Sequence, residues 1–232
     1  MPLALLLAAC TATPTIHDAD VSATTETASS PIIAMDQHSF AQPGKAVITH
    51  LDLDIDVDMV AHRITGTAAY AVKRTSGDSV VFDTEGLDIH AVTLMDGTPL
   101  KFTLGDSSFM GRALAVELPA GADHVRIAYA TGPDARALQW LSPAQTADKK
   151  LPFLFTQGEA ILTRSWIPVQ DSPGIRFTYN ARVKVPSDLM AVMSAHNPQQ
   201  EQGYVYAFAK DKVTGKAKVF NHLIGNLMTS VS

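Results

Sequence analysis

Apolar and polar side chains alternate strictly between residues 51 and 59, where the chain reads LDLDIDVDM. Alternation with a period of two places five apolar side chains on one face and four aspartates on the other, which is typical of a half-buried antiparallel strand. Four carboxylates on one face could instead supply oxygen ligands for calcium. Because successive residues on one face lie about 7 Å apart along a strand, a solvated strand face is the better interpretation.

Shorter apolar runs follow, and turn residues separate them. The runs expected to form strands are 64–73, 80–82, 89–95, 100–104, 114–118, 124–129, 153–155, 176–185, 189–194 and 204–208. Asp96-Gly97 lies between two of these runs and is a strong signal for a tight hairpin. Ser142-Pro143-Ala144-Gln145 has the residues of a capped helix start and predicts one helical turn. Closely spaced strands without a convincing amphipathic helix predict an all-β sandwich or meander.

The first ten residues have a different pattern. They contain an apolar run that ends in Leu7-Ala8-Ala9-Cys10. This quartet resembles the lipobox of bacterial lipoproteins, so we expect a lipoprotein-type signal over 1–10 with Cys10 as the lipidated residue. No Lys or Arg precedes the run, which leaves a start codon assigned too late, or merely an apolar N-terminus, as alternatives. Cys10 is the only cysteine, so an internal disulfide is excluded.

Residues 11–44 are rich in Thr, Ser, Ala and Pro, contain few large apolar residues and show no clear period. Such a segment buries too little apolar surface to offset the conformational entropy lost on ordering, so this composition predicts a flexible linker. A linker behind a lipidated cysteine would hold a globular domain at a membrane surface. We therefore expect an exported protein of the bacterial cell envelope, facing the periplasm or attached to the outer membrane.

The composition of the chain narrows its partners. With 232 residues, 46% of them hydrophobic, the chain can bury the core of one large domain or two small ones. A net charge of −5 with scattered signs gives no basic stripe, which argues against nucleic acid as a partner. No apolar run reaches the roughly 18 residues of a membrane-spanning helix.

The blocks LQWL, TQGEA and QDSP, which all lie between residues 137 and 195, carry a family resemblance. They resemble the N-terminal domain of zinc aminopeptidases of the aminopeptidase N type (peptidase family M1), nearest to leukotriene A4 hydrolase and its bacterial aminopeptidase relatives. Shorter matches at 50–53 and 82–87 occur in the same order, so the resemblance covers roughly residues 45–208. It implies a saddle-like β-domain with antiparallel and mixed sheets, packed against a thermolysin-like catalytic domain.

The resemblance also implies a substrate-binding loop formed by Gln157, Gly158, Glu159 and Ala160. Glu159 matches the acidic residue that binds the free α-amine of a peptide, and Gln157 and Ala160 match positions that line the first side-chain pocket. An ammonium group held in a partly desolvated cleft needs a carboxylate partner. Leukotriene A4 hydrolase has Gln where this chain has Glu159, which favours the peptidase activity. Without the resemblance, a Glu beside a Gly would be interpreted as a solvated loop residue.

Four further residues lie on matching positions of the family: Arg164, Trp166, Asp171 and Pro173. For these we expect a structural role, in which an Arg–Asp pair and a buried indole shape the loop beneath the cleft. A carboxylate held by an arginine under a substrate loop would stiffen that loop.

Zinc peptidases of this family need His-Glu-x-x-His on a helix, so that both imidazoles face one metal ion. The histidines at positions 17, 38, 50, 62, 90, 124, 196 and 222 include no pair four residues apart. We therefore expect no catalytic residue, no metal site and no cofactor in this chain, which should be inactive alone. The resemblance implies zinc for the intact enzyme, and the missing zinc domain and the peptide N-terminus as partners.

The last 24 residues, 209–232, are interpreted as a divergent or truncated tail. Residues 225–229, GNLMT, resemble either the stretch after the second zinc histidine of the family or the strand that closes the β-domain. A gene fragment, a deletion or a frameshift would explain such a tail, and an independent domain with its own tail is the alternative.

The sequence thus favours a non-catalytic domain that anchors peptide α-amines for a zinc aminopeptidase. The alternatives are a free-standing lipid-anchored β-domain that binds peptides or a protein partner, and a decaying gene product that does not fold stably.

Overall fold

The computed structural model describes residues 35–195, 204–208, 219–220 and 227–231, with the side chains described as far as residue 195. All of these residues belong to one compact unit, 33–232. Cys10 and the linker up to residue 34 lie outside the described residues. The described part of the chain contains no helix long and apolar enough to cross a membrane.

Strands make up almost all of the regular structure, as the sequence predicts. In chain order they are β1 (Ala46–Asp58), β2 (Arg63–Arg74), β3 (Ser79–Thr84), β4 (Asp88–Thr93), β5 (Phe102–Leu104), β6 (Arg112–Glu117), β7 (His124–Ala130), β8 (Leu138–Leu141), β9 (Phe153–Thr156), β10 (Arg176–Lys184), β11 (Leu189–Met193), β12 (Tyr204–Phe208), β13 (Val219–Phe220) and β14 (Leu227–Val231). Two single 3-10 turns, η1 (Pro143–Gln145) and η2 (Thr163–Ser165), complete the described elements. The first confirms the predicted helical turn, because the Ser142 backbone N–H donates to the Gln145 side chain at 3.0 Å.

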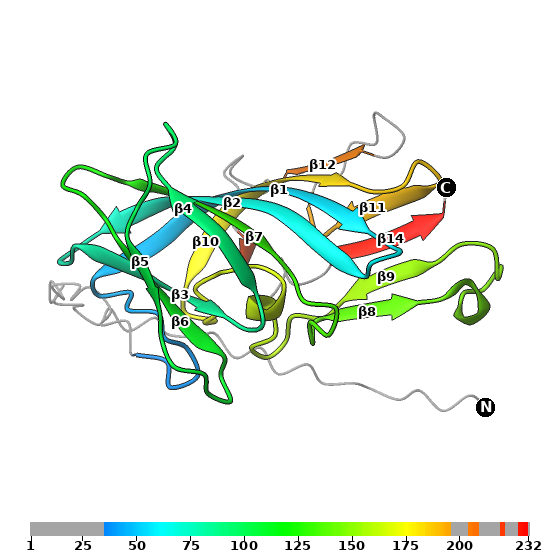
Figure 1. The fold of residues 1–232 in the computed structure, drawn as a ribbon, viewed down its shortest axis with the longest axis horizontal. Helices are drawn as coiled ribbons and strands as arrows, with labels where there is room; N and C mark the ends of the chain where they lie inside the picture. Colours follow the sequence, from blue (N-terminus) through cyan, green and yellow to red (C-terminus); the bar gives the residue numbers. More distant parts are fainter. Residues whose placement is uncertain (1–34, 196–203, 209–218, 221–226, 232) are drawn as a thin grey trace, which may run out of the picture. The chain divides into compact units, whose positions relative to one another are not determined.

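The largest sheet has seven strands (Figure 1). Its order is β12-β10-β1-β2-β7-β4, and β13 pairs with the first two residues of β10. β1 is antiparallel to β2 but parallel to β10, so the sheet is mixed. The predicted alternation in β1 is confirmed, because Leu51, Leu53, Ile55 and Val57 are at most 2% exposed.

The aspartates of β1 lie on the outer face of this sheet, and the parallel register gives three of them partners on β10. The cross-strand contacts are Asn180 Nδ2 to Asp52 Oδ1 (2.9 Å), Arg182 Nη2 to Asp54 Oδ2 (3.1 Å) and Lys184 Nζ to Asp56 Oδ2 (2.6 Å). The fourth, Asp58, accepts from the backbone N–H groups that follow it. These partners favour the solvated strand face over the calcium interpretation. The sequence predicts the exposed face but not the pairing, which depends on which strand lies beside β1.

The Asp96-Gly97 signal correctly predicts a tight turn whose flanking residues pair, but the strands before and after it continue into different sheets. Gly97 has φ +90°, and its N–H donates to the Leu94 carbonyl at 3.1 Å. However, β4 pairs with β7 in the large sheet, whereas β5 pairs with β6 in a three-stranded sheet. Next to the turn the chain pairs as a short hairpin, with a bridge between Thr93 and Pro99. The Leu94 N–H donates to the Thr98 carbonyl at 2.8 Å, and the Leu100 N–H donates to the Val92 carbonyl at 2.9 Å. The turn residues fix the local geometry, while longer partner strands decide the pairing.

Two smaller sheets complete the fold. β3-β6-β5 form the three-stranded sheet, and β11-β14-β9-β8 form a four-stranded sheet. β8 and β13 were not predicted as strands, and for β14 a closing strand was one of two interpretations of 225–229. β14 pairs with β11 and with β9, which agrees with the closing-strand interpretation.

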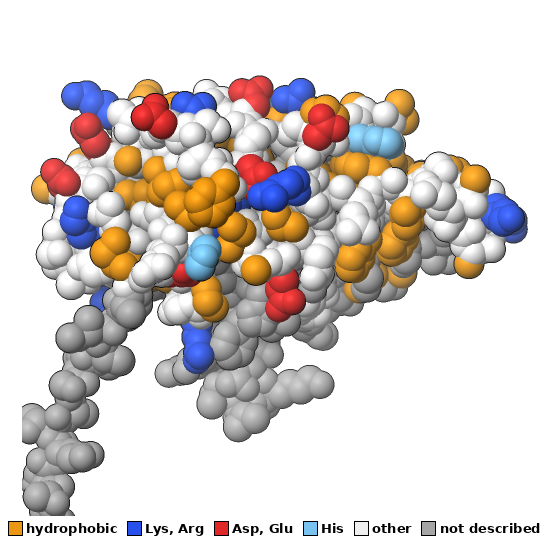
Figure 2. Space-filling view, turned by 90° about the horizontal axis from the view of Figure 1, so that it is seen from below, with side chains coloured by type: hydrophobic (Ala, Val, Ile, Leu, Met, Phe, Trp, Pro, Cys, Tyr) orange, Lys and Arg blue, Asp and Glu red, His pale blue; other side chains and the backbone are white. Residues whose placement is uncertain are grey.

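The core lies under the inner face of the large sheet, where β2 meets β3. The rings of Tyr70 and Phe82 have centroids 5.0 Å apart, and both side chains are fully buried. Trp166, in the segment after η2, belongs to the same core. On the face drawn in Figure 2, basic and acidic side chains are interspersed between apolar ones, which matches the scattered charge of the sequence.

Candidate functional site

The loop predicted to bind substrate connects β9 to η2. Gln157 donates its backbone N–H to the Ala137 carbonyl at 2.9 Å, and Leu162 donates to the Gly158 carbonyl at 2.8 Å. These two bonds close a tight turn around Glu159 and Ala160, whose shared peptide bond is cis. The structure therefore brings all four predicted residues together in one turn.

Exposure differs sharply within this turn. Gly158 is buried and Gln157 is half-buried, whereas Glu159 and Ala160 are exposed. Among the described residues, the Glu159 carboxylate forms no hydrogen bond and no ion pair. The turn thus presents a carboxylate to its surroundings from a backbone that is fixed on both sides.

Beneath the turn, Arg164 is completely buried at 0% exposure. Its Nε donates to Asp171 Oδ2 at 3.1 Å, so the predicted Arg–Asp pair is confirmed. Its two terminal nitrogens donate to the carbonyls of Met110 and His38 at 3.0 and 2.8 Å. One guanidinium therefore joins η2, the β5–β6 connection and the segment before β1.

Asp83, the last residue but one of β3, is a second buried carboxylate of this cluster and was not predicted. It accepts hydrogen bonds from Ser39 Oγ (2.6 Å), the Phe40 N–H (2.6 Å) and the Asp171 N–H (2.8 Å). Arg164 Nη1 lies 3.7 Å from Asp83 Oδ1. The signal in the sequence was weak, because Asp83 directly follows the apolar run 80–82 and a charge buried there needs partners.

Burial raises the pKa of Asp171 to about 6, although the Arg164 guanidinium beside it acts in the opposite direction. The repulsive Asp83 carboxylate adds to the rise of this pKa. One cation thus serves two carboxylates in a water-poor environment.

The rest of the segment 163–172 is buried as well. Trp166 is 0% exposed, as predicted, and the Tyr70 hydroxyl donates to the Pro168 carbonyl at 2.5 Å. The Gln170 side chain accepts from the Ile48 N–H and donates to two backbone carbonyls, at 2.9–3.1 Å. Pro173, in contrast, is exposed. The base of the site turn is therefore fixed by side-chain bonds to β1, β2 and β3.

Among the described residues, no group of three or more His, Cys, Asp or Glu side chains is placed to hold a metal ion. This part of the chain therefore offers no set of ligands that fits a zinc ion.

These observations define the class of protein. It is an all-β domain with an exposed carboxylate on a fixed loop and a buried Arg–Asp cluster at the base of that loop. Residues 47–213 match the Peptidase M1 N-terminal domain, and the chain belongs to this family. The predicted family and fold class are thus confirmed.

Curated relatives show the same relationship. The chain is 40% identical over 168 residues to leukotriene A-4 hydrolase of Xenopus laevis, covering 69% of this chain and 27% of the relative. It is 34% identical over 151 residues to leucine aminopeptidase 2 of Yarrowia lipolytica, covering 63% of this chain and 23% of the relative. The chain therefore spans about a quarter of the length of these relatives.

Solved structures agree with this assignment. Yeast leukotriene A4 hydrolase in complex with bestatin superposes with a TM-score of 0.76 at 25% identity, over 88% of this chain and 31% of that one. A zinc metallopeptidase of the M1 family from Deinococcus radiodurans, in a mutant bound to a Tyr-Ser-Ala substrate, gives 0.59 at 19% identity, over 80% and 42%. The second comparison shows a shared fold alone.

Proposed function

We propose that this domain anchors the α-ammonium group of a peptide substrate for a zinc aminopeptidase, with Glu159 as the anchoring carboxylate. The observation that carries the proposal is the exposed Glu159 side chain, without a partner among the described residues, on a turn whose base is buried. An unpaired carboxylate in a fixed position is suited to a cationic ligand group.

Preorganisation is the physical reason for such a design. A charge-assisted hydrogen bond from an ammonium to a carboxylate is strongest where the cleft excludes water. Fixing the amine also sets its distance to the scissile bond, so that one residue is released per cleavage. The two backbone bonds of the turn and the Arg164 cluster hold the Glu159 backbone in place before substrate arrives.

Gln157 and Ala160 flank the proposed anchor. The half-buried amide of Gln157 and the small exposed side chain of Ala160 would line the pocket for the first side chain of the peptide. Gly158 is buried between Gln157 and Glu159 and provides the backbone carbonyl that closes the turn.

Zinc would belong to the catalytic domain of an intact enzyme. Two relatives are named as a hydrolase and an aminopeptidase, and the Deinococcus neighbour is named as a zinc metallopeptidase. These names support a peptidase partner domain, with the N-terminus of a peptide as the shared ligand.

A second candidate function follows from Cys10. A lipidated cysteine and a linker over residues 11–34 would let the β-domain act at a membrane surface as a binding module for peptides or a protein partner. Calorimetric titration of the 232-residue chain with Leu-Ala-Ala, and with its N-acetylated form, separates the two candidates. If the chain is a binding module, it should bind Leu-Ala-Ala but not the acetylated peptide. If it is an anchor that needs a catalytic domain, it should bind neither peptide.

In an enzyme that contains this domain, the anchor is tested by Glu159→Gln with free and acetylated peptides. A loss of activity on the free peptide alone supports the anchor. An equal loss of activity on both peptides removes Glu159 from the site.

A further inference from the structure

The outer face of the seven-stranded sheet carries a hollow that is unrelated to the Glu159 turn. Its volume is about 420 Å³, which lies within the usual range of small-molecule sites. The hollow lies across β10, β1, β2 and β7, and Met95 from the turn after β4 forms part of its wall.

The sheet register explains the lining. Asp52 lies opposite Asn180 on one side and opposite Ala69 on the other, and Ala69 in turn lies opposite Arg126. The row across the face is therefore Asn180, Asp52, Ala69 and Arg126. Because adjacent strands are about 4.8 Å apart, two strand spacings separate the backbones of Asp52 and Arg126.

The two carboxylates that line the hollow both have partners. The Asp54 carboxylate accepts from both Nε and Nη2 of Arg182, at 3.2 and 3.1 Å. Asp52 Oδ1 accepts from Asn180 at 2.9 Å and lies 3.3 Å from His50 Nε2. Both carboxylates are thus bound on the β10 side of the face.

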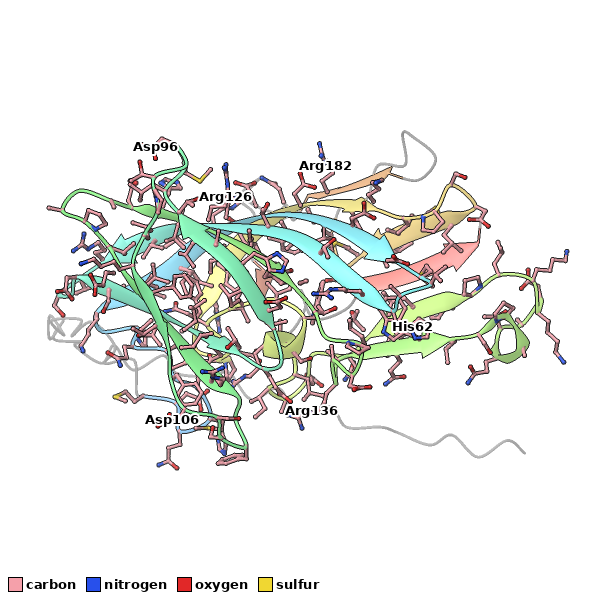
Figure 3. All side chains as sticks on the ribbon, in the orientation of Figure 1. His62, Asp96, Asp106, Arg126, Arg136 and Arg182 are labelled. Atoms are coloured by element: carbon pink, nitrogen blue, oxygen red, sulfur yellow. The ribbon has the colours of Figure 1, made fainter. Side chains whose placement is uncertain are left out.

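Arg126 has no such partner. Its side chain is half-buried, and among the described residues it has no ion pair and no hydrogen bond from its guanidinium. The methyl group of Ala69 offers nothing to bind across the row. Figure 3 shows Arg126 and Arg182 on the same side of the sheet. Both line the hollow, but of the two only Arg182 has an ion-pair partner among the described residues.

We propose that this hollow binds a carboxylate-bearing ligand, with the Arg126 guanidinium as its anchor. A guanidinium presents a planar fork that matches a carboxylate with two parallel hydrogen bonds. Met95 and Ala69 contact the aliphatic part of the ligand. The carboxylate belongs either to a free small acid or to the C-terminus of a polypeptide. Because the hollow is open, the dissociation constant is on the order of 1 mM.

The proposal is tested by NMR titration of the isotope-labelled 232-residue chain. The first probe is N-acetyl-methionine, and its neutral control is N-acetyl-methionine amide. The acid should shift the Arg126 side-chain signal and its neighbours on β2 and β7 saturably, whereas the amide should not. Saturable binding of both compounds with equal affinity would overturn the proposal, as would the absence of saturation with the acid.

Variants locate the site. Arg126→Gln should weaken the binding of N-acetyl-methionine at least tenfold. Arg126→Lys, which retains the charge but loses the planar guanidinium, should weaken this binding less. Arg112→Gln, an exposed arginine on the three-stranded sheet, is the matched control and should change binding less than twofold. Unchanged binding in Arg126→Gln would overturn the proposal.

A second pair of probes identifies the source of the carboxylate. N-acetyl-Ala-Ala-Met and its amide present the same group at the end of a peptide. If the tripeptide acid binds with the affinity of N-acetyl-methionine, the site recognises polypeptide C-termini. If the tripeptide acid does not bind, the ligand is a free small acid. The Glu159 variants leave either result unchanged, so this site and the proposed peptidase role fail or hold separately.

Discussion

Arg164 and Asp171 lie seven residues apart in the chain, and both are buried with 3.1 Å between Nε and Oδ2. The contact closes the segment that follows the site turn onto itself. Asp83 from β3 shares the same guanidinium. A substrate turn is thereby attached to the sheet core through charged groups rather than through packing alone.

Removing the guanidinium should be costly. Arg164→Met keeps much of the side-chain volume but leaves two carboxylates buried without a cation. We expect a loss of about 3–5 kcal/mol in the free energy of unfolding, measured by urea at pH 7. Arg182→Met is the control, because its exposed pair with Asp54 should cost at most about 1 kcal/mol. Similar small losses in both variants would contradict the structural role of the cluster.

The same cluster makes stability depend on pH. Burial raises the pKa of Asp171 from 3.8 to about 6, so the folded state binds the proton more tightly than the unfolded chain. The stabilising contribution is complete below about pH 4 and is lost as the pH rises through 6. The two-unit difference corresponds to roughly 3 kcal/mol. Asp171→Asn should remove this slope between pH 4 and 7, whereas Asp52→Asn on the exposed face should preserve it. Parallel stability–pH curves for wild type and Asp171→Asn would contradict the assignment.

The sequence predicts local geometry well and long-range pairing poorly. Period-two alternation identified β1 and its buried face, because that signal depends on one strand alone. The partners of three β1 aspartates lie on β10, more than 120 residues away, and only the parallel register brings Arg182 to Asp54. The Asp96-Gly97 turn shows the same limit, since turn residues do not determine which sheet each flanking strand joins.

In the candidate site, too, contacts within one segment were predicted and partners from distant segments were missed. The Arg164–Asp171 pair and the buried Trp166 came from the family resemblance, and the structure confirms both. Asp83 and Ser39 were missed because they reach the cluster from β3 and from the segment before β1, which the expected linker included up to residue 44.

Gly66 on β2 should not tolerate a side chain. A Cβ built at this position would lie 2.1 Å from the Asp54 carbonyl oxygen on the neighbouring strand. Gly66→Ala must therefore push β2 away from β1, and we expect a loss of about 2–3 kcal/mol in urea unfolding. Gly44→Ala is the matched control, because a Cβ there meets nothing within 4 Å. Equal stability of the two variants would contradict the close approach of these strands.

Export through Cys10 is tested by fractionation. Expressed in a Gram-negative host from its natural start, the protein should sediment with membranes and carry a lipid mass on Cys10. Cys10→Ser should release it, because one lipidated residue and a linker are the only membrane attachment expected. A soluble cytoplasmic wild type without lipid on Cys10 would show that the lipobox interpretation is wrong.

The decisive prediction concerns Glu159. In a full-length zinc enzyme that carries this domain, Glu159→Gln preserves the shape of the side chain and removes its charge. Transition-state binding of peptides with a free N-terminus should weaken by roughly 2–4 kcal/mol, the range for truncating one partner of a desolvated charge pair. Since about 1.4 kcal/mol corresponds to a tenfold change, kcat/KM should fall roughly 30- to 1000-fold.

Acetylated peptides distinguish an anchor from a structural residue. Lacking an ammonium group, they should be poor substrates of wild type and of Glu159→Gln alike, with little difference between the two enzymes. Glu117→Gln, an exposed glutamate at the end of β6, is the matched control and should leave both substrates unaffected. A structural Glu159 would lower the stability of the enzyme and reduce turnover of both substrates by the same factor. The ratio of the two losses, rather than either loss alone, therefore decides whether this carboxylate holds the α-ammonium group.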